Sequence, residues 1–250
     1  MKTGIALTLL LLTCKTDIAP EISPYPGGME KSAYLTGKYD PKKYLVEYTN
    51  PLEKNTFYLR KDTADALDKM LADFAAETGI PVKQHIFVSS AFRSYTHQKA
   101  IWEDKFRGRR KMRESVAGKS PEQIVKLILE YSSAPGTSRH HWGTDFDINV
   151  LTNDYYRTGG RGEYIYKWLS ANARKYGFCQ PYNEYEKRNN KGYNEERWHW
   201  SYRPAAKILQ RDWNSLLDSG EINFNGAFSG SDLLGSRPRD YVNSVNRECL

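Results

Sequence analysis

The spacing of apolar residues along the chain predicts several amphipathic helices. From Thr63 onward, apolar side chains recur with a helical period that ends near Gly79. Residues 95–106 (YTHQKAIWEDKF) form a second predicted helix. Residues 120–123 (SPEQ) combine a serine cap, a proline at the first helical position and a glutamine that reaches back, which predicts the start of a third helix. The amphipathic segment 163–177 is a further predicted helix, closed by its terminal glycine.

Short strands are predicted between these helices. Residues 144–151 (TDFDINVL) alternate strictly between apolar and polar, which is the period of a strand with two different faces. One face would carry Phe146, Ile148 and Val150, and the other Asp145, Asp147 and Asn149. Residues 85–94 (HIFVSSAFRS) and 197–202 (RWHWSY) are the other predicted strands, and Pro204 opens a last helix. Because helices and strands mix without βαβ order, the predicted class is α+β, with a central antiparallel sheet flanked by helices.

The N-terminus carries the features of an export signal. Lys2 precedes an uncharged apolar run over residues 4–13, which is too short to span a bilayer as a mature helix. The run ends Leu-Leu-Thr-Cys at Cys14, an order that resembles the lipobox of bacterial lipoproteins. Residues 1–14 are therefore predicted to be a signal peptide with a lipobox-like end, and a lipid on Cys14 would anchor the chain to a membrane. The alternative is an ordinary cleaved signal peptide, and either one places the protein outside the cytoplasm, in the periplasm or cell envelope.

Composition divides the rest of the chain into three parts. Residues 15–55 are rich in Pro, Gly, Lys and Tyr without sustained periodicity, and are predicted to be an N-terminal tether and irregular segment. Residues 56–220 contain the predicted helices and strands and are expected to form one folded domain. Residues 221–250 are rich in Gly, Ser and Asn, which predicts a C-terminal tail that is partly disordered or acts as a lid.

The charge balance favours anionic partners. The chain has 37 Lys and Arg against 30 Asp and Glu, a net charge of +7 that would suit nucleic acid, a phospholipid surface or a wall polymer. Nucleic acid is disfavoured, because the chain has an export signal and no recognisable groove-reading motif. The basic run 107–113 (RGRRKMR) is predicted to be a solvated face, with contact to an anionic wall polymer or lipid headgroups as the alternative.

Cys179 and Cys249 are the two cysteines besides Cys14. They could pair in an oxidising compartment, but two cysteines do not make a disulfide scaffold. Cys179 lies in YGFCQPY and is predicted to be a buried small apolar residue. Neither has CxxC spacing, so a thiolate zinc site is excluded.

The segment 138–149 (SRHHWGTDFDIN) contains two of the five histidines of the chain. A catalytic zinc site needs three protein donors and a position open to water. His140 and Asp147 lie seven residues apart, with a glycine between them that permits a tight turn into the strand. His199 in EERWHW offers a third donor, and Glu196 would be a carboxylate near the metal but not on it, as a general base requires.

The other histidines are not expected to bind metal. His141 follows His140 directly, and one chain cannot easily direct both neighbours at one ion, so His141 is predicted to contact substrate instead. His85 and His97 have no recognisable partners and are predicted to be structural.

Three blocks in this order resemble the D,D-carboxypeptidase/VanY family of zinc peptidases, which shares its fold with the Hedgehog signalling domain. They are residues 89–98 (SSAFRSYTHQ), the pattern Ser138-x-His140-x-x-Gly143-x-x-x-Asp147, and Glu196-x-Trp198-His199. The resemblance spans roughly Asp62 to Tyr202 and implies a fold like that of the Hedgehog and D,D-peptidase domains.

The resemblance also implies the roles of individual residues. It makes His140, Asp147 and His199 the ligands of one zinc ion. It makes Glu196 the base that deprotonates the attacking water and later protonates the leaving amine, and Arg93 the group that stabilises the oxyanion.

Substrate binding is implied for a second group of residues. Ser138 and Gln98 would hold the substrate peptide or its terminal carboxylate. Trp198 belongs to the matched motif and is a further candidate, with a place in the core as its alternative.

Asp145 departs from the family, which commonly has Ala at this position. Strand alternation points Asp145 to the same side as Asp147, so it could orient a ligand histidine or bind a substrate amine. The alternative is a partly exposed acid beside a basic surface. A regular strand would also put Glu196 and His199 on opposite faces, so the family arrangement requires Glu196 on the turn leading in, or a bulge.

The leading functional hypothesis is a zinc D,D-carboxypeptidase that removes the terminal D-Ala from peptidoglycan stem peptides. A D,D-dipeptidase or a peptidoglycan endopeptidase of the same family is the close alternative, because loops such as 183–194 (NEYEKRNNKGYN) set the length of substrate admitted. The alternative outside the enzymes is a non-catalytic zinc-containing domain that binds the cell wall. The presence of Glu196, Arg93 and all three ligands argues against it.

Overall fold

The computed structural model describes residues 24–49, 55–157, 159–188 and 190–250. The predicted signal peptide and Cys14 lie outside these described residues. Within the described ranges, no helix combines the length and the apolar composition that crossing a membrane requires.

Helices and short strands follow one another along the described chain. The α-helices are α1 (Lys31–Leu35), α2 (Pro41–Tyr44), α3 (Lys61–Thr78), α4 (Val82–His85), α5 (Tyr95–Phe106), α6 (Pro121–Leu129), α7 (Arg161–Asn172), α8 (Arg203–Asp218) and α9 (Arg237–Asn243). The strands are β1 (Val46–Thr49), β2 (Thr56–Leu59), β3 (Val88–Ser90), β4 (Asp145–Ile148), β5 (Phe178–Cys179) and β6 (His199–Tyr202). β1 and β2 form an antiparallel hairpin, and a second antiparallel sheet has the order β3-β4-β6-β5. The predicted α+β class with a central antiparallel sheet is confirmed.

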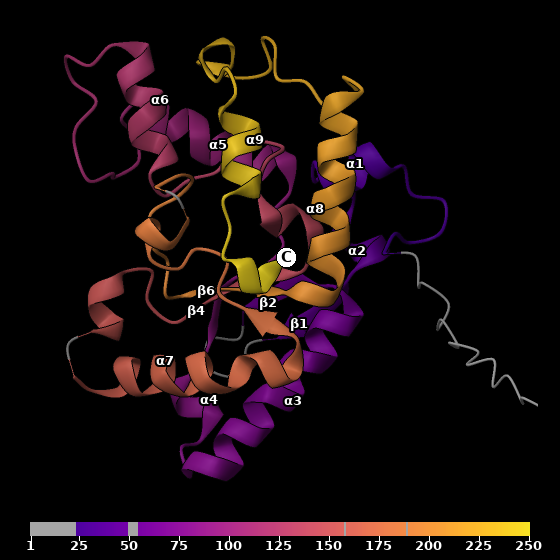
Figure 1. The fold of residues 1–250 in the computed structure, drawn as a ribbon, viewed down its shortest axis with the longest axis vertical. Coiled ribbons are helices and arrows are strands. Elements are labelled where there is room, and N and C mark those ends of the chain that lie inside the picture. The colour runs from indigo at the N-terminus through magenta and orange to yellow at the C-terminus, as the bar shows by residue number, and fades with distance from the viewer. Residues whose placement is uncertain (1–23, 50–54, 158, 189) are drawn as a thin grey trace, which may run out of the picture.

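The helices cover the four-stranded sheet from two sides. In Figure 1, α3, α4 and α7 lie below the sheet, and α5, α6, α8 and α9 lie above it. Alternate residues of the strands face the lower group and form the main core. The sheet contributes Phe146, Ile148, Phe178 and Trp200 to this core, and the helices contribute Leu67, Phe74, Ile165 and Leu169. Burial of these side chains is the main stabilising term that joins the sheet to α3 and α7.

The opposite face of the same strands is polar, yet equally buried. It carries Asp145, Asp147, His199 and Ser201. The strand β4 ends at Ile148, because Asn149 adopts a left-handed conformation with φ of 53°. The side-chain amide of Asn149 donates to the carbonyl of His85 at 3.0 Å. Val150 therefore leaves the sheet and is 41% exposed, so its predicted place on the apolar face was wrong.

Residues 221–250 fold onto the domain instead of forming a loose tail. They contain α9, and their apolar side chains Ile222, Phe228, Leu234, Val242 and Val245 are buried against α5, α6 and α8. Cys249 forms a disulfide with Cys179 of β5. The prediction of a partly disordered tail or a lid was wrong. Pro204 opens a helix, α8, as predicted, but α9 follows it, so α8 is not the last helix. Cys179 is buried, as predicted, but it is paired.

The described part of the segment before residue 56 is also more regular than predicted. It holds α1, α2 and β1, and β1 pairs with β2. Tyr34 and Leu35 of α1 are fully buried in a cluster with Trp142 and α8. The Tyr34 hydroxyl donates to the carbonyl of Trp142 at 2.7 Å. This segment is therefore packed into the same domain.

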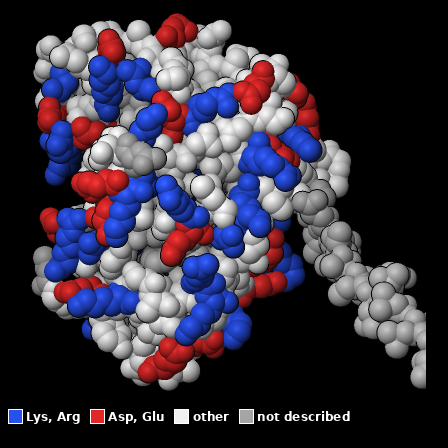
Figure 2. Space-filling model, viewed as in Figure 1, with Lys and Arg blue, Asp and Glu red and all other residues white. Residues whose placement is uncertain are grey.

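Basic and acidic side chains are interspersed over the face of the molecule in Figure 2. The basic run 107–113 follows this rule, since Arg107 lies 3.2 Å from Glu103 and Arg109 lies 2.6 Å from Asp104. Most of the run is exposed, as predicted for a solvated face.

Candidate active site

Strand pairing brings three side chains of metal-ligand type together. In the register of β4 and β6, Asp147 lies opposite His199. His140 comes from a 3-10 turn (Arg139–Trp142) that leads into β4 through Gly143, whose φ is 69°. One nitrogen from each histidine and one Asp147 oxygen lie within 4.8 Å of one another.

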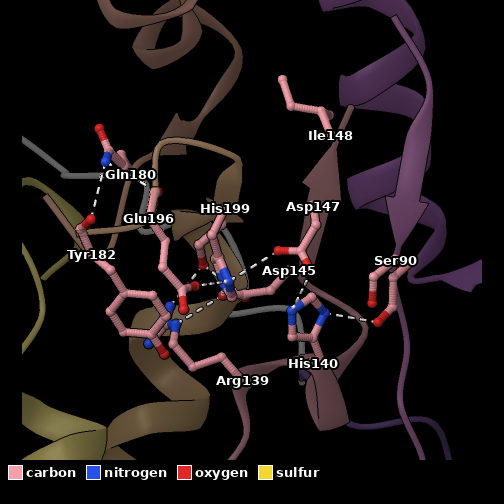
Figure 3. A network of polar contacts seen from close by, with 12 residues as sticks. Ser90, Arg139, His140, Asp145, Asp147, Ile148, Gln180, Tyr182, Glu196 and His199 are labelled. Atoms are coloured by element: carbon pink, nitrogen blue, oxygen red, sulfur yellow. Dashed lines mark hydrogen bonds and ion pairs between the residues drawn. The ribbon is translucent and has the colours of Figure 1, made fainter. Parts of the chain in front are cut away.

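Each histidine is oriented through the nitrogen that faces away from this point. His140 Nδ1 donates to the carbonyl of Ala91 at 2.8 Å, which leaves Nε2 directed at Asp147 Oδ2, 3.4 Å away. His199 Nε2 donates to Asp145 Oδ2 at 2.9 Å, which leaves Nδ1 3.2 Å from Asp147 Oδ1. Figure 3 shows both rings converging on the Asp147 carboxylate. Because the outward hydrogen bond of a ligand histidine sets its tautomer, each ring offers its inner nitrogen to a metal.

The charges around the centre of His140, Asp147 and His199 favour the binding of a cation. Burial alone would raise the pKa of Asp147, but His140 and His199 lower it below its usual range. Burial alone would lower the pKa of His199, but the neighbouring carboxylates of Asp145, Asp147 and Glu196 raise it well above the usual value. Asp147 Oδ1 is buried and accepts no hydrogen bond from any described residue. Two imidazoles and a carboxylate in this geometry fit Zn²⁺ with a further position left open.

A buried ion pair lies directly behind His199. Arg139 Nε donates to Asp145 Oδ2 at 3.0 Å, and both side chains are fully buried. Arg139 also donates to Ser201 Oγ at 2.7 Å and to Gln210 Oε1 of α8 at 2.9 Å. Arg139 and His199 keep the pKa of Asp145 below its usual value although burial opposes ionisation. Asp145 is thus fixed as an ionised partner of the His199 ring.

Glu196 lies on the turn that leads into β6. The amide of His199 donates to the carbonyl of Glu196 at 3.3 Å. This bond closes a turn over residues 196–199, and β6 begins at its last residue. This turn directs the Glu196 carboxylate to the same side as His199, with Oε2 3.3 Å from Nδ1. Burial raises the pKa of Glu196 above its usual value. The preceding Glu195 differs, because its carboxylate is paired with Arg157 and Arg197.

Arg93 lies on the other side of the cluster, between β3 and α5. Its guanidinium donates to Gln98 Oε1 and to Ser90 Oγ, each at 2.9 Å, and lies 3.8 Å from Asp147 Oδ2. Its backbone amide donates to the carbonyl of His140 at 3.1 Å. Arg93 is therefore held by its neighbours while one side of it faces the cavity.

A family model described as "VanY: D-alanyl-D-alanine carboxypeptidase" matches residues 56–205 of the chain. This is more than half of its length. The chain belongs to the VanY D-alanyl-D-alanine carboxypeptidase family. The resemblance stated from the three sequence blocks is confirmed.

Individual relatives cover parts of the chain. A D-alanyl-D-alanine carboxypeptidase of Enterococcus faecalis is 28% identical over 127 residues, which are 50% of this chain and 43% of that protein. An uncharacterized protein of Haemophilus influenzae is 30% identical over 110 residues, which are 40% of this chain and 78% of that protein. The solved structure of VanYB in complex with D-alanine-D-alanine is 22% identical, with a TM-score of 0.49, over 73% of this chain and 91% of that chain. The chain thus spans less than half the length of the enterococcal relative.

The VanY-type cluster opens into a cavity of about 470 Å³. Its wall includes the three candidate metal ligands, Glu196 and Arg93, and a set that the sequence did not single out. The second set comprises Lys105, Arg110, Tyr131, Asn153, Asp154, Tyr182 and Tyr193. Tyr182 lies in the GFCQPY segment and Arg110 in the basic run, but neither has a spacing that links it to the zinc motif. Trp198 is buried and also lines this cavity, and its contact with substrate stays a prediction.

Two residues predicted to hold substrate are not among the described residues that line the cavity. Gln98 is fully buried, receives a hydrogen bond from Arg93 and donates to the carbonyl of Ser133 at 2.7 Å. It supports Arg93 instead of touching substrate. Ser138 is also buried, and its hydroxyl has no partner among the described residues. The substrate contact predicted for Gln98 therefore does not fit the structure, whereas the contact predicted for Ser138 stays a prediction.

Asp145 and His141 also require correction. Asp145 is fully buried behind His199 and does not line the cavity, so a substrate contact and the alternative of a partly exposed acid are both wrong. His141 is fully buried as well. Its Nε2 accepts from the amide of Gly136 at 3.1 Å and its Nδ1 donates to the carbonyl of Arg93 at 2.6 Å. His141 therefore joins the 3-10 turn to the Arg93 segment and does not contact substrate.

Proposed function

We propose that the chain is a zinc-dependent D,D-carboxypeptidase that removes the terminal D-Ala from peptidoglycan stem peptides. The observation that supports this most is the convergence of two oriented imidazoles and Asp147 beside the buried carboxylate of Glu196, at the base of a cavity. Membership of the VanY family supports the peptidase class.

His140 Nε2, Asp147 and His199 Nδ1 would hold one Zn²⁺ ion. Such an ion supplies a Lewis acid and an activated water at neutral pH. Asp145 holds the His199 ring in the orientation that this binding requires, since it accepts the hydrogen bond from the outer nitrogen at 2.9 Å.

Glu196 is the proposed general base. Its carboxylate lies 3.3 Å from His199 Nδ1 and forms no ion pair with a described arginine. It accepts the proton of the attacking water and then delivers that proton to the amine of the leaving D-Ala. Because burial raises its pKa, Glu196 retains this proton more readily than an exposed glutamate would.

Arg93 is the proposed oxyanion-stabilising group. Gln98 and Ser90 fix its guanidinium, so it needs little reorganisation when negative charge develops on the carbonyl oxygen of the peptide bond that is cleaved. The preorganised positive charge would stabilise the transition state more than the ground state.

The proposed localisation is the cell envelope, after export, with a lipid anchor at Cys14. Stem peptides lie outside the cytoplasm, which agrees with the signal-like N-terminus. A D,D-dipeptidase or endopeptidase would use the same catalytic residues on a different length of peptide.

The test is mass spectrometry of pentapeptide stems incubated with the purified protein, with chelator and after zinc is restored. We expect zinc-dependent loss of a single alanine. Glu196→Gln should lower the rate by about 100- to 10,000-fold, as expected for loss of a general base. Glu195→Gln is the matched control and should remain active, because Glu195 is paired with Arg157 and Arg197.

Other products would redirect or overturn the proposal. Loss of a dipeptide or internal cleavage would retain the metal chemistry and change the specificity. No cleavage of any stem by zinc-loaded protein would overturn the enzyme and favour a zinc-containing wall-binding domain.

A further inference from the structure

Two cations on the wall of the catalytic cavity lack acidic partners. Lys105 lies near the end of α5, and Arg110 follows on the loop after it. The Lys105 ammonium donates to the hydroxyl of Ser132 at 2.5 Å, and no ion pair joins it to a described acid. The Arg110 guanidinium makes neither a hydrogen bond nor an ion pair with any described residue.

Neighbouring cations of the same segment are arranged differently. Arg107 pairs with Glu103 at 3.2 Å, and Arg109 pairs with Asp104 at 2.6 Å. Lys105 and Arg110, in contrast, line the cavity and make no ion pair with a described acid. Cations that pair with no acid are candidates for binding an anion when they line a cavity.

Lys105 lies within electrostatic range of the catalytic residues. Burial, followed by repulsion from Arg110, lowers the pKa of Lys105 to about 8, whereas Glu196 acts in the opposite direction. Lys105 and the more exposed Arg110 thus line the same cavity as Glu196 and Arg93.

The proposed substrate supplies an anion at a defined place. A carboxypeptidase that removes one residue cleaves the bond next to a free carboxylate, and successive residues advance by at most about 3.6 Å. The carboxylate must therefore lie about one residue from the carbonyl next to Arg93 and Glu196. Gln98 already bonds Arg93 and the carbonyl of Ser133, so it is not available as a partner of this carboxylate.

We propose that Lys105 and Arg110 bind the terminal carboxylate of the substrate and so determine specificity for a free peptide end. This inference rests on the proposed function, because it uses the substrate of that reaction. The two side chains contribute charge-assisted hydrogen bonds to a carboxylate that a continuing peptide or a terminal amide lacks. They would favour removal of a terminal residue over cleavage inside the stem.

The test compares two pentapeptide stems that differ only at the end, one with a free carboxylate and one with a carboxamide. We expect wild-type protein to prefer the free acid by about 10- to 100-fold in kcat/KM, the range expected for a charge-assisted hydrogen bond. Lys105→Met and Arg110→Gln should each reduce this preference through a higher KM for the acid. Their kcat, and their activity on the amide, should change little. Arg109→Gln is the matched control and should keep the wild-type preference, because Arg109 pairs with Asp104 outside the cavity wall.

A binding measurement separates this inference from the proposed reaction. Calorimetric titration of zinc-loaded Glu196→Gln protein with both peptides reports the acid preference without turnover. Suppose that the wild-type protein cleaves no stem while Glu196→Gln still binds the acid more tightly than the amide. If adding Lys105→Met to Glu196→Gln then removes this preference, the proposed reaction is wrong and the carboxylate site stands. If both peptides bind alike, if neither binds, or if Lys105→Met and Arg110→Gln keep the full preference, the carboxylate site is overturned.

Discussion

The two faces of the central sheet are both buried but are held by different forces. On the lower face, Phe146 and Trp200 pack against α3 and α7 through contacts that have little directional requirement. On the upper face, Asp145, Asp147 and His199 are held by hydrogen bonds and ion pairs of defined geometry. One strand, β4, serves both faces through simple alternation.

This difference suggests that stability and chemistry are separable within one strand. Apolar burial tolerates small shifts in position, whereas metal binding depends on which nitrogen and which oxygen point inward. We therefore expect changes on the lower face to affect the free energy of unfolding, and changes on the upper face to affect zinc binding.

The largest expected effect is on the lower face. Phe146→Ala should lower the free energy of unfolding by about 3–5 kcal/mol, because it removes a fully buried aromatic ring and leaves a cavity. Urea denaturation of the zinc-free protein measures this loss. Val150→Ala is the control from the same segment; its side chain is 41% exposed, so its effect should stay within about 0.5 kcal/mol. Equal losses in the two variants would contradict the assignment of the faces.

Zinc should restore stability only where the upper face is intact. At free zinc 100 times the dissociation constant, the folded state should gain about 2.7 kcal/mol. With free zinc at 100 times its own dissociation constant, Phe146→Ala should gain about as much unfolding free energy as wild type. Asp147→Asn should gain little at the zinc concentration that stabilises wild type. The measurement is thermal unfolding across a zinc titration. Full stabilisation of Asp147→Asn by zinc would remove Asp147 from the proposed ligand set.

The smallest of these effects concerns the residue behind the metal site. Asp145→Asn should weaken zinc binding by about 10- to 100-fold, because the His199 ring loses its carboxylate partner. Competition with a chromogenic chelator measures the affinity, and circular dichroism verifies that the variant is folded. Asp154→Asn is the control, since Asp154 lines the cavity without a bond to either ligand histidine. Unchanged affinity in Asp145→Asn would assign Asp145 a purely structural pairing with Arg139.

Local patterns in the sequence predicted much of the fold. The segment 95–106 is helical from its first to its last predicted residue, and the capping box before α6 forms as its residues indicate. The helical period from Thr63 ends at Gly79, which adopts a left-handed conformation with φ of 69°. These features depend on neighbours within a few residues, so periodicity and capping chemistry are sufficient to predict them.

Features that depend on distant contacts were predicted less well. The apolar residues of segment 221–250 follow no clear helical or strand period. In the structure they are buried in two clusters that include side chains of α5, α6 and α8. The pairing of Cys179 with Cys249 brings together residues 70 positions apart. Lys105 and Arg110 belong to an ordinary basic stretch until the fold places them beside the catalytic cluster.

The sequence by itself determined that Asp145 and Asp147 share one face of a strand, because side chains alternate with a period of two. Tertiary structure decided what each carboxylate does, since only the packing of β6 and Arg139 places one behind His199 and the other between two imidazoles. The adjacent histidines show the same division. His140 and His141 are equivalent by local chemistry, but the carbonyls of Ala91 and Arg93 orient one toward Asp147 and fix the other in the core. Local spacing sets the direction of a side chain, and the long-range contact it meets there sets its role.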